Sequence, residues 1–207
     1  VGGDDEGDLM ELVERYRAQG IKRLLCLRGD QPSGTSARPT YARDLVSLLR
    51  NTFGDAFQIC VAAYPEVHPD SANVAKDLFH FQEKVRAGAD TAITQYFYCA
   101  EAYAFFLDGC ASQGLDIPIT PGIMPITNYS ALVRFSKKAG ADIPRWLDKQ
   151  LSQREQDSPD LVSFGIEVVS KLCERLIALG APGLHFYTLN RWGASTRICQ
   201  NLGYANH

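Results

Sequence analysis

The feature of this sequence that most constrains its fold is a repeated alternation of short apolar segments with amphipathic helical segments. Five apolar segments read as strands, at about residues 21–27, 57–64, 91–98, 117–126 and 183–190. Parallel strands require crossover connections, which are usually helices, so this alternation predicts a parallel sheet with helical crossovers. The predicted fold class is therefore α/β.

The segments between the predicted strands carry apolar residues at helical spacing. They predict helices at about residues 9–16, 45–49, 78–85, 103–110, 130–139, 159–179 and 194–202. The polar stretch at residues 145–160 reads as a loop or a short helix, and Asp157, Ser158 and Pro159 form a helix start. Several aromatic residues are expected in the core and the barrel wall, namely Tyr96, Phe97, Tyr98, Phe105 and Phe106.

Length and composition exclude several classes of protein. A chain of 207 residues that is 45% hydrophobic can build one sizeable core or at most two small ones, and residues 1–207 are expected to form a single domain. A net charge of −3 does not favour nucleic acid or an anionic membrane as the main partner. No apolar run reaches the roughly 20 residues of a membrane span. The six cysteines stand singly, without metal-binding spacing, which favours a reducing cytoplasm and no metal site.

Polar residues gather where four of the predicted strands end. These strand ends are Arg28-Gly29-Asp30, Tyr64 to His68, Gln95, and Thr188 to Arg191. A (β/α) barrel builds its active site at the carboxyl ends of its strands, and a doubly wound sheet follows a similar rule, so the polar ends alone leave both folds open. No GxGxxG motif follows any strand, which counts against a Rossmann fold. Guanidinium, amide and carboxylate groups together suit a polar, anionic ligand that contains a ring.

Five of these segments, in order and in register, resemble one known family. They are LRGD, AAYPEVHPD, ITQYFY, PGIMPI and GLHFYTLNR, and the similarity runs from about Leu12 to Leu202. They closely resemble the flavin-dependent methylenetetrahydrofolate reductases. The resemblance implies a (β/α)8 TIM barrel, of which this chain supplies about the last five βα units, or the C-terminal two-thirds of one catalytic FAD-binding domain. The family begins with three further strands and a general-acid Glu, and neither has a counterpart here.

The resemblance also implies an activity. NAD(P)H would reduce FAD, and the reduced flavin would convert 5,10-methylenetetrahydrofolate to 5-methyltetrahydrofolate, which links one-carbon metabolism to methionine biosynthesis. The implied partners are the folate substrate and NAD(P)H. The implied setting is a cytoplasmic homo-oligomer without nucleic acid or membrane.

Site residues follow from the resemblance position by position. Asp30 would tune the flavin and the folate electrostatically. The other residues expected to contact FAD are Arg28, Gly29, Tyr41, Ala42, Ala62, Tyr64, His68, Asp77, His80 and Lys84. Asp77 and Lys84 would hold the ribose, adenine or phosphate end, and the individual role of His80 near the adenine end is left open. The residues expected to bind folate are Asp30, Gln95, Tyr129 and Arg191, with Gln95 and Tyr129 also serving the nicotinamide ring. Glu66 either contacts the cofactor or only braces its turn, and the sequence leaves both open.

Two other functions compete with this interpretation. If the 207 residues are the whole molecule, the chain would be a non-catalytic barrel fragment that binds a ligand or a partner chain through an open sheet edge. A lyase acting on a phosphorylated substrate is a weaker alternative. It is disfavoured because no Lys stands at a strand end and no glycine-rich loop follows the last strand.

Overall fold

The computed structural model describes residues 6–27 and 41–204. The predicted residues Arg28, Gly29 and Asp30 lie outside the described residues. Five strands form one sheet in the order β1-β2-β3-β4-β5. Their bounds are β1 Arg23–Cys26, β2 Gln58–Ala63, β3 Thr91–Tyr96, β4 Ile119–Ile123 and β5 His185–Phe186.

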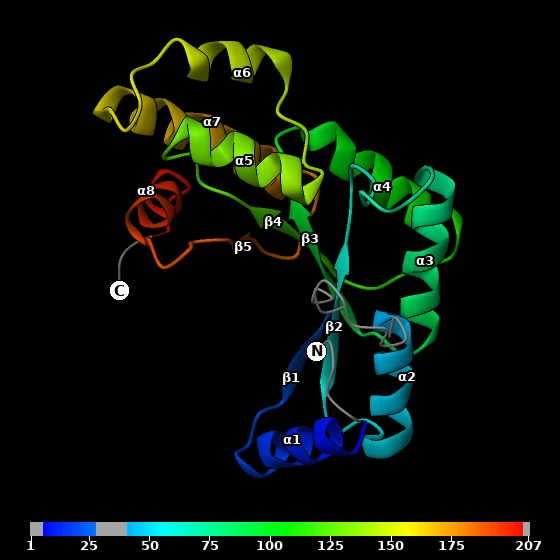
Figure 1. Ribbon diagram of the computed structural model, residues 1–207. Coiled ribbons are helices and arrows are strands. Elements are labelled where there is room, and N and C mark those ends of the chain that lie inside the picture. Colours follow the sequence, from blue (N-terminus) through cyan, green and yellow to red (C-terminus); the bar gives the residue numbers. More distant parts are fainter. Residues whose placement is uncertain (1–5, 28–40, 205–207) are drawn as a thin grey trace, which may run out of the picture.

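Each strand pairs in parallel with the next strand along the chain. A doubly wound sheet reverses its strand order at a switch point, whereas a (β/α) barrel adds its strands consecutively. The consecutive order therefore decides between the two folds that the sequence left open. The chain has an α/β fold whose five parallel strands form a curled half-barrel (Figure 1).

Eight helices are described in residues 6–27 and 41–204. Their bounds are α1 Glu6–Ala18, α2 Ala42–Phe53, α3 Val74–Arg86, α4 Ala100–Ser112, α5 Tyr129–Ala139, α6 Arg145–Ser152, α7 Pro159–Ala178 and α8 Gly193–Asn201. Helices α2, α3 and α4 lie side by side along one face of the sheet (Figure 1). The predicted start of α7 is confirmed, because the Ser158 side chain accepts a hydrogen bond from the Leu161 N–H and Pro159 opens the helix. None of the described helices combines the length and hydropathy that crossing a membrane requires.

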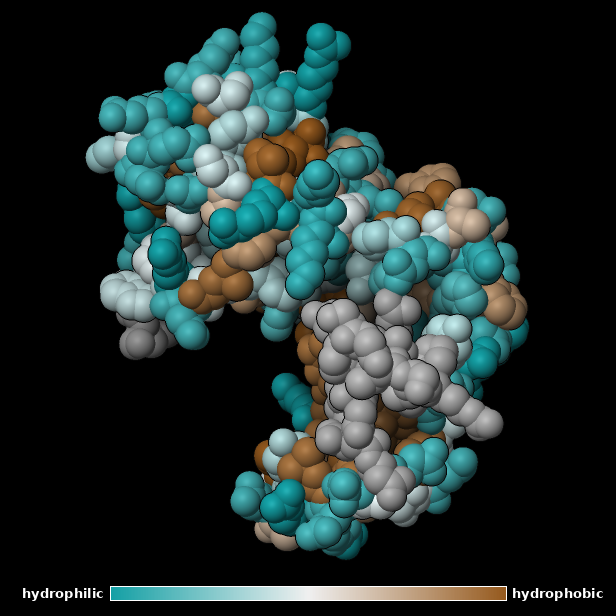
Figure 2. Space-filling model, viewed as in Figure 1, coloured by the Kyte–Doolittle hydropathy of each residue, from teal (hydrophilic) through white to brown (hydrophobic). Residues whose placement is uncertain are grey.

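The two faces of the central strands differ in burial. In β2 and β3 alternate residues are buried with the helices in the core, namely Ile59, Val61, Ala63, Ala92, Thr94 and Tyr96. Successive side chains of a strand point to opposite faces, so Ala62 and Gln95 lie on the other face, where burial is only partial. Figure 2 shows that the molecule is hollowed on the side of β1, where Leu25 within the strand and Leu27 just after it are 50% and 45% exposed.

The structure corrects two expectations from the sequence and decides a third that was left open between a loop and a short helix. The last strand contains only His185 and Phe186, because Leu189 and Asn190 adopt left-handed φ angles of 48° and 60° and end the extended segment as a turn. The polar stretch after Pro144 contains α6, which is anchored by the fully buried Leu147 and Leu151. The aromatic core prediction holds for Tyr96, Phe97, Tyr98 and Phe106 and is wrong for Phe105, which is 65% exposed.

Candidate functional site

The segment that follows β2 consists of two consecutive turns, Tyr64–Val67 and His68–Ser71, which we call the double turn. The Val67 N–H donates to the Tyr64 carbonyl at 3.4 Å, and the Ser71 N–H donates to the His68 carbonyl at 2.8 Å. Pro65 and Pro69 each occupy the second position of a turn, where a fixed φ near −65° suits the backbone. The two prolines therefore make this strand end a rigid platform.

Val67 joins the two turns in a strained conformation. Its φ angle is +78°, in the left-handed region, which a β-branched residue rarely adopts. Such strain costs about 1–3 kcal/mol per residue, persists only where the surroundings enforce it, and collects at ligand-binding and active sites. The backbone thus marks the double turn as a candidate functional segment independently of any motif.

Helix α3 holds one side of the double turn. The Tyr64 and His68 rings meet edge to face, with centroids 4.5 Å apart. The backbone N–H of His68 donates to the Asp77 carboxylate at 3.3 Å, and the backbone N–H of Asp70 donates to the ring nitrogen Nδ1 of His68 at 3.0 Å. Since Nδ1 accepts a hydrogen bond, the imidazole proton sits on Nε2. The positions of Tyr64 and His68 are therefore fixed by contacts on both residues.

Asp77, His80 and Lys84 share one face of α3 and form a cluster of mixed charge with His68. Lys84 Nζ donates to the carbonyl of Ala62 at 2.5 Å. Burial lowers the pKa of Lys84 to about 8, and the charge of Asp77 partly opposes this change. Burial also raises the pKa of Asp77, while the His68 N–H and the nearby Lys84, His68 and His80 oppose that rise. A carboxylate among three basic groups can recognise ribose hydroxyls and phosphate oxygens.

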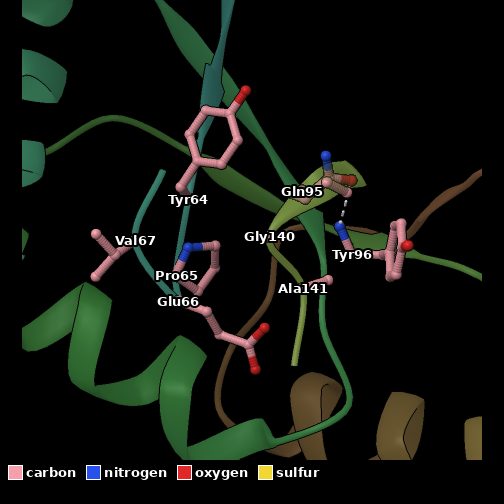
Figure 3. A pocket seen from close by; sticks show the side chains of 9 residues that line it. Tyr64, Pro65, Glu66, Val67, Gln95, Tyr96, Gly140 and Ala141 are labelled. Carbon is pink, nitrogen blue, oxygen red and sulfur yellow. Dashed lines mark hydrogen bonds between the residues drawn. The ribbon is translucent and has the colours of Figure 1, made fainter. Parts of the chain in front are cut away.

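A small hollow joins the double turn to the end of β3. Its lining residues are Tyr64, Pro65, Glu66, Val67, Gln95, Tyr96, Ala139, Gly140 and Ala141 (Figure 3). The β2–β3 register pairs Ala62 with Ile93, which brings Tyr64 beside Gln95 two residues later. The enclosed volume is about 10 Å³, the space of one water molecule, so a ring-sized ligand would lie over the hollow rather than inside it.

Glu66 lies at the side of the hollow that faces the segment after α5. Its carboxylate accepts a hydrogen bond from the Asp142 N–H at 2.9 Å. Burial raises the pKa of Glu66 to about 7; the Asp142 charge adds to this rise and the hydrogen bond opposes it. Between the alternatives that the sequence left open, this geometry favours the bracing role.

The segment Gly140–Asp142 was missed by the sequence analysis as part of the site. Gly140 ends α5 in a left-handed conformation, and a Cβ there would lie 2.5 Å from Pro69 Cγ, so glycine permits the close approach to the double turn. The glycine after a helical pattern was a detectable signal for a helix end. Its contact with a loop about 70 residues earlier had no local signal.

The remaining predicted residues lie away from the hollow. Tyr41 is the N-cap of α2 and Ala42 is its first residue. Tyr129 begins α5, and its hydroxyl donates to Asp148 of α6 at 2.6 Å. Arg191 is exposed, and its N–H donates to the Thr188 carbonyl at 2.8 Å. The structure brings Tyr64 and Gln95 into one hollow but does not bring Tyr41, Tyr129 or Arg191 there.

Metal binding finds no support in the part of the chain that the structure describes. Within residues 6–27 and 41–204, no group of three or more His, Cys, Asp or Glu side chains is placed to hold a metal ion. The six cysteines are all free thiols.

A parallel half-barrel with polar side chains at the carboxyl ends of its strands belongs to the class of (β/α)-barrel proteins, whose ligand sites lie at that end. An uncharacterized protein from Clostridium thermocellum has a similar fold, with a TM-score of 0.57 and 18% sequence identity, over 96% of this chain and 89% of that chain. The family profile described as Methylenetetrahydrofolate reductase matches residues 4–203. The chain therefore belongs to the methylenetetrahydrofolate reductase family.

Individual relatives agree with this assignment. The chain is 38% identical to 5,10-methylenetetrahydrofolate reductase of Pectobacterium carotovorum over 195 residues, which cover 94% of this chain and 65% of that protein. It is also 38% identical to 5,10-methylenetetrahydrofolate reductase of Escherichia coli, over 95% of this chain and 66% of that protein. A probable methylenetetrahydrofolate reductase (NADPH) of Caenorhabditis elegans is 35% identical over 96% of this chain and 31% of its own length. The chain thus spans just under two-thirds of the length of these bacterial relatives.

Proposed function

We propose that this chain carries the cofactor-binding and folate-binding end of a flavin-dependent reductase. The proposed reaction reduces 5,10-methylenetetrahydrofolate to 5-methyltetrahydrofolate with FAD and NAD(P)H. One observation carries the proposal: in a member of this family, Tyr64 and Gln95 from neighbouring strands line one hollow at the carboxyl ends of the sheet. These are the positions at which the family resemblance expects flavin and folate contacts.

The charged groups of α3 and the double turn fit FAD. An FAD molecule combines a ring system with a ribose, an adenine and a pyrophosphate. Asp77 interacts electrostatically with His68, His80 and Lys84, and the four residues offer both carboxylate and cationic groups for the ribose and the phosphates. Tyr64 lies against His68 and offers an aromatic surface next to this cluster. These residues would hold the cofactor between the carboxyl end of β2 and the face of α3 that carries Asp77, His80 and Lys84.

The chemistry that FAD supplies when bound is the uptake of a hydride from NAD(P)H and its delivery to the folate. The protein's own contribution is to position the reactants. The side-chain oxygen of Gln95 accepts a hydrogen bond from the backbone N–H of Tyr96 at 3.1 Å. The NH2 group of Gln95 is therefore left to donate toward a ligand. We assign to Gln95 the binding of folate and nicotinamide in turn, to Arg191 a folate carboxylate, and to Asp30 the electrostatic tuning of the flavin.

A second candidate function is folate binding without reduction. The Clostridium thermocellum protein with a similar fold is described as binding two copies of 5-methyl-5,6,7,8-tetrahydrofolic acid. A folate carrier would need the folate-binding residues but neither FAD nor NAD(P)H. The two functions therefore differ in whether the protein binds a flavin.

The experiment uses the purified, full-length natural protein. The visible absorbance spectrum is recorded before and after FAD is added, then under anaerobic conditions with NADH or NADPH, and finally with methylenetetrahydrofolate. We expect a bound flavin that is bleached by the nicotinamide and reoxidised by the folate. A colourless protein that binds methyltetrahydrofolate but no FAD would refute the proposal in favour of the carrier.

A substitution separates the two half-reactions. Gln95→Ala should leave FAD bound and slow reoxidation by folate, because the amide that addresses the folate is gone. Gln113→Ala, at the exposed end of α4, is the matched control and should leave both half-reactions unchanged. Equal rates in Gln95→Ala and the unmodified protein would contradict the role of Gln95.

A further inference from the structure

The double turn is held from two sides by elements that lie far apart in the sequence. On the side of α3, Asp77 accepts the His68 N–H, and Lys84 donates to the Ala62 carbonyl at the end of β2. On the other side lies the segment after α5, where Gly140 packs against Pro69 and the Asp142 N–H reaches Glu66. The second side contributes a hydrogen bond that joins residues 76 positions apart.

Glu66 is oriented toward this second side. Figure 3 shows its carboxylate turned away from Tyr64 and Gln95 and toward the segment that carries Gly140 and Ala141. Its orientation fits a bracing contact better than a direct contact with a ligand over the hollow. The next residue, Val67, is the strained one, so the Glu66 hydrogen bond acts at the point where the backbone most needs an external restraint.

We propose that Glu66 is a positioning residue for the cofactor platform. By accepting the Asp142 N–H, its carboxyl group holds the strained double turn in the form in which the Tyr64 and His68 rings meet. On the function proposed above, this form is the one that receives FAD. Glu66 then acts through Tyr64 and His68 and does not itself touch the reacting atoms.

The proposal depends on a hydrogen-bond acceptor at position 66 and not on its charge. Glu66→Gln keeps an acceptor oxygen of the same reach, whereas Glu66→Ala removes it. Asp142→Ala is the matched control, because the donor is the backbone N–H, which this substitution retains. If the role of Glu66 were electrostatic, Glu66→Gln would behave like Glu66→Ala.

Two measurements on the full protein test the proposal. The first is amide hydrogen exchange over residues 64–71 and 140–142 without ligand. The second is the dissociation constant for FAD, measured by quenching of flavin fluorescence. Loss of one hydrogen bond of ordinary strength lowers the equilibrium constant between the competent and the opened form about tenfold, which weakens FAD binding by up to the same factor. We expect this change and faster exchange in Glu66→Ala, with values within about twofold of the unmodified protein in Glu66→Gln and Asp142→Ala.

The outcomes separate this inference from the proposed function. Unchanged exchange in Glu66→Ala would overturn the bracing contact. Faster exchange with unchanged FAD affinity would overturn its role in cofactor binding, and so would a Glu66→Gln variant as weak as Glu66→Ala. Failure of the unmodified protein to bind FAD would refute the proposed function, while the exchange comparison would still decide whether Glu66 braces the double turn.

Discussion

Removal of the Arg50 side chain should destabilise the fold without affecting the ligand site. Arg50 lies in the last turn of α2, at the end of the sheet where the strands begin. Its guanidinium donates to the carbonyls of Gly88, Gly54 and Phe57 at 2.8, 3.0 and 2.9 Å. It also pairs with Asp90 at 2.5 Å, and the same Asp90 oxygen accepts the Ile59 N–H at 2.6 Å. One side chain therefore ties α2, the start of β2 and the α3–β3 connection together.

The expected loss follows from these contacts. Arg50 is only 16% exposed, so its hydrogen bonds to backbone carbonyls are worth about 1 kcal/mol each. Asp90 is 42% exposed, so solvent screening holds the ion pair to about 1 kcal/mol or less. Arg50→Met keeps much of the side-chain volume and should lower the free energy of unfolding by about 3 kcal/mol. For a chain of this size, that loss lowers Tm by about 6–12 °C.

Urea unfolding followed by circular dichroism measures this loss. Arg86→Met is the matched control, because Arg86 is 63% exposed and reaches Glu83 only at 3.7 Å, so its removal should cost less than about 0.5 kcal/mol. Arg50→Lys should recover little of the stability, since an ammonium cannot reproduce the planar fork that serves several acceptors at once. A loss below about 1 kcal/mol in Arg50→Met would refute the reasoning.

Three further predictions concern the carboxyl end of the sheet and its strands. Gly122→Ala should lower the free energy of unfolding by more than about 3 kcal/mol, because the new Cβ would lie 2.2 Å from the Thr94 carbonyl oxygen and 2.6 Å from Tyr187. Gly183→Ala is the control: its Cβ would meet no atom within 4 Å, so this variant should be neutral in the same urea titration. Val67→Asn should stabilise the protein by about 1 kcal/mol, since Asn tolerates the left-handed φ, and a clear loss of stability would show that Val67 is not strained. Burial among Asp142, Tyr96 and Tyr98 raises the pKa of Glu66 in the folded protein from 4.5 to about 7. The protonated Glu66 therefore contributes stability that is fully present below about pH 4.5 and is lost as the pH rises through about 7. The Tm advantage of Glu66→Gln over the unmodified protein should therefore grow across that interval, and a constant difference would contradict the raised pKa.

The fold could be predicted from the sequence because its signals are local and repeated. Strands and helices alternate with clear periodicity, and all five predicted strands are present in the sheet. The end of β5 could not be predicted, because Tyr187 and Thr188 are residue types that favour strands and only the backbone turn at Leu189 and Asn190 ends the extended segment. Helix α6 was left open because its stretch is mostly polar, although Leu147 and Leu151 stand four residues apart, at helical spacing.

The candidate site could be predicted only where strand ends define it. Tyr64 and Gln95 were expected at one mouth because parallel strands end at the same edge of the sheet, and both line the hollow. The bracing role of Glu66 depends on the Asp142 N–H, a partner that no local pattern indicates. Tyr129 donates a hydrogen bond to Asp148 of α6, and this contact was likewise not visible in the sequence. Contacts between distant connections were therefore beyond sequence reasoning.

The two ends of the sheet differ in how their polar groups are satisfied. At the end where the strands begin, Arg50 and Asp90 pair with each other and with backbone groups. At the carboxyl end, Val67 is strained, and burial moves the pKa of Glu66 and of Lys84 toward neutrality. Costs of this kind persist where a fold is shaped for binding rather than for stability alone. Removal of the Arg50 side chain should therefore change stability more than ligand affinity, and removal of the Lys84 or Glu66 side chain should change ligand affinity more than stability.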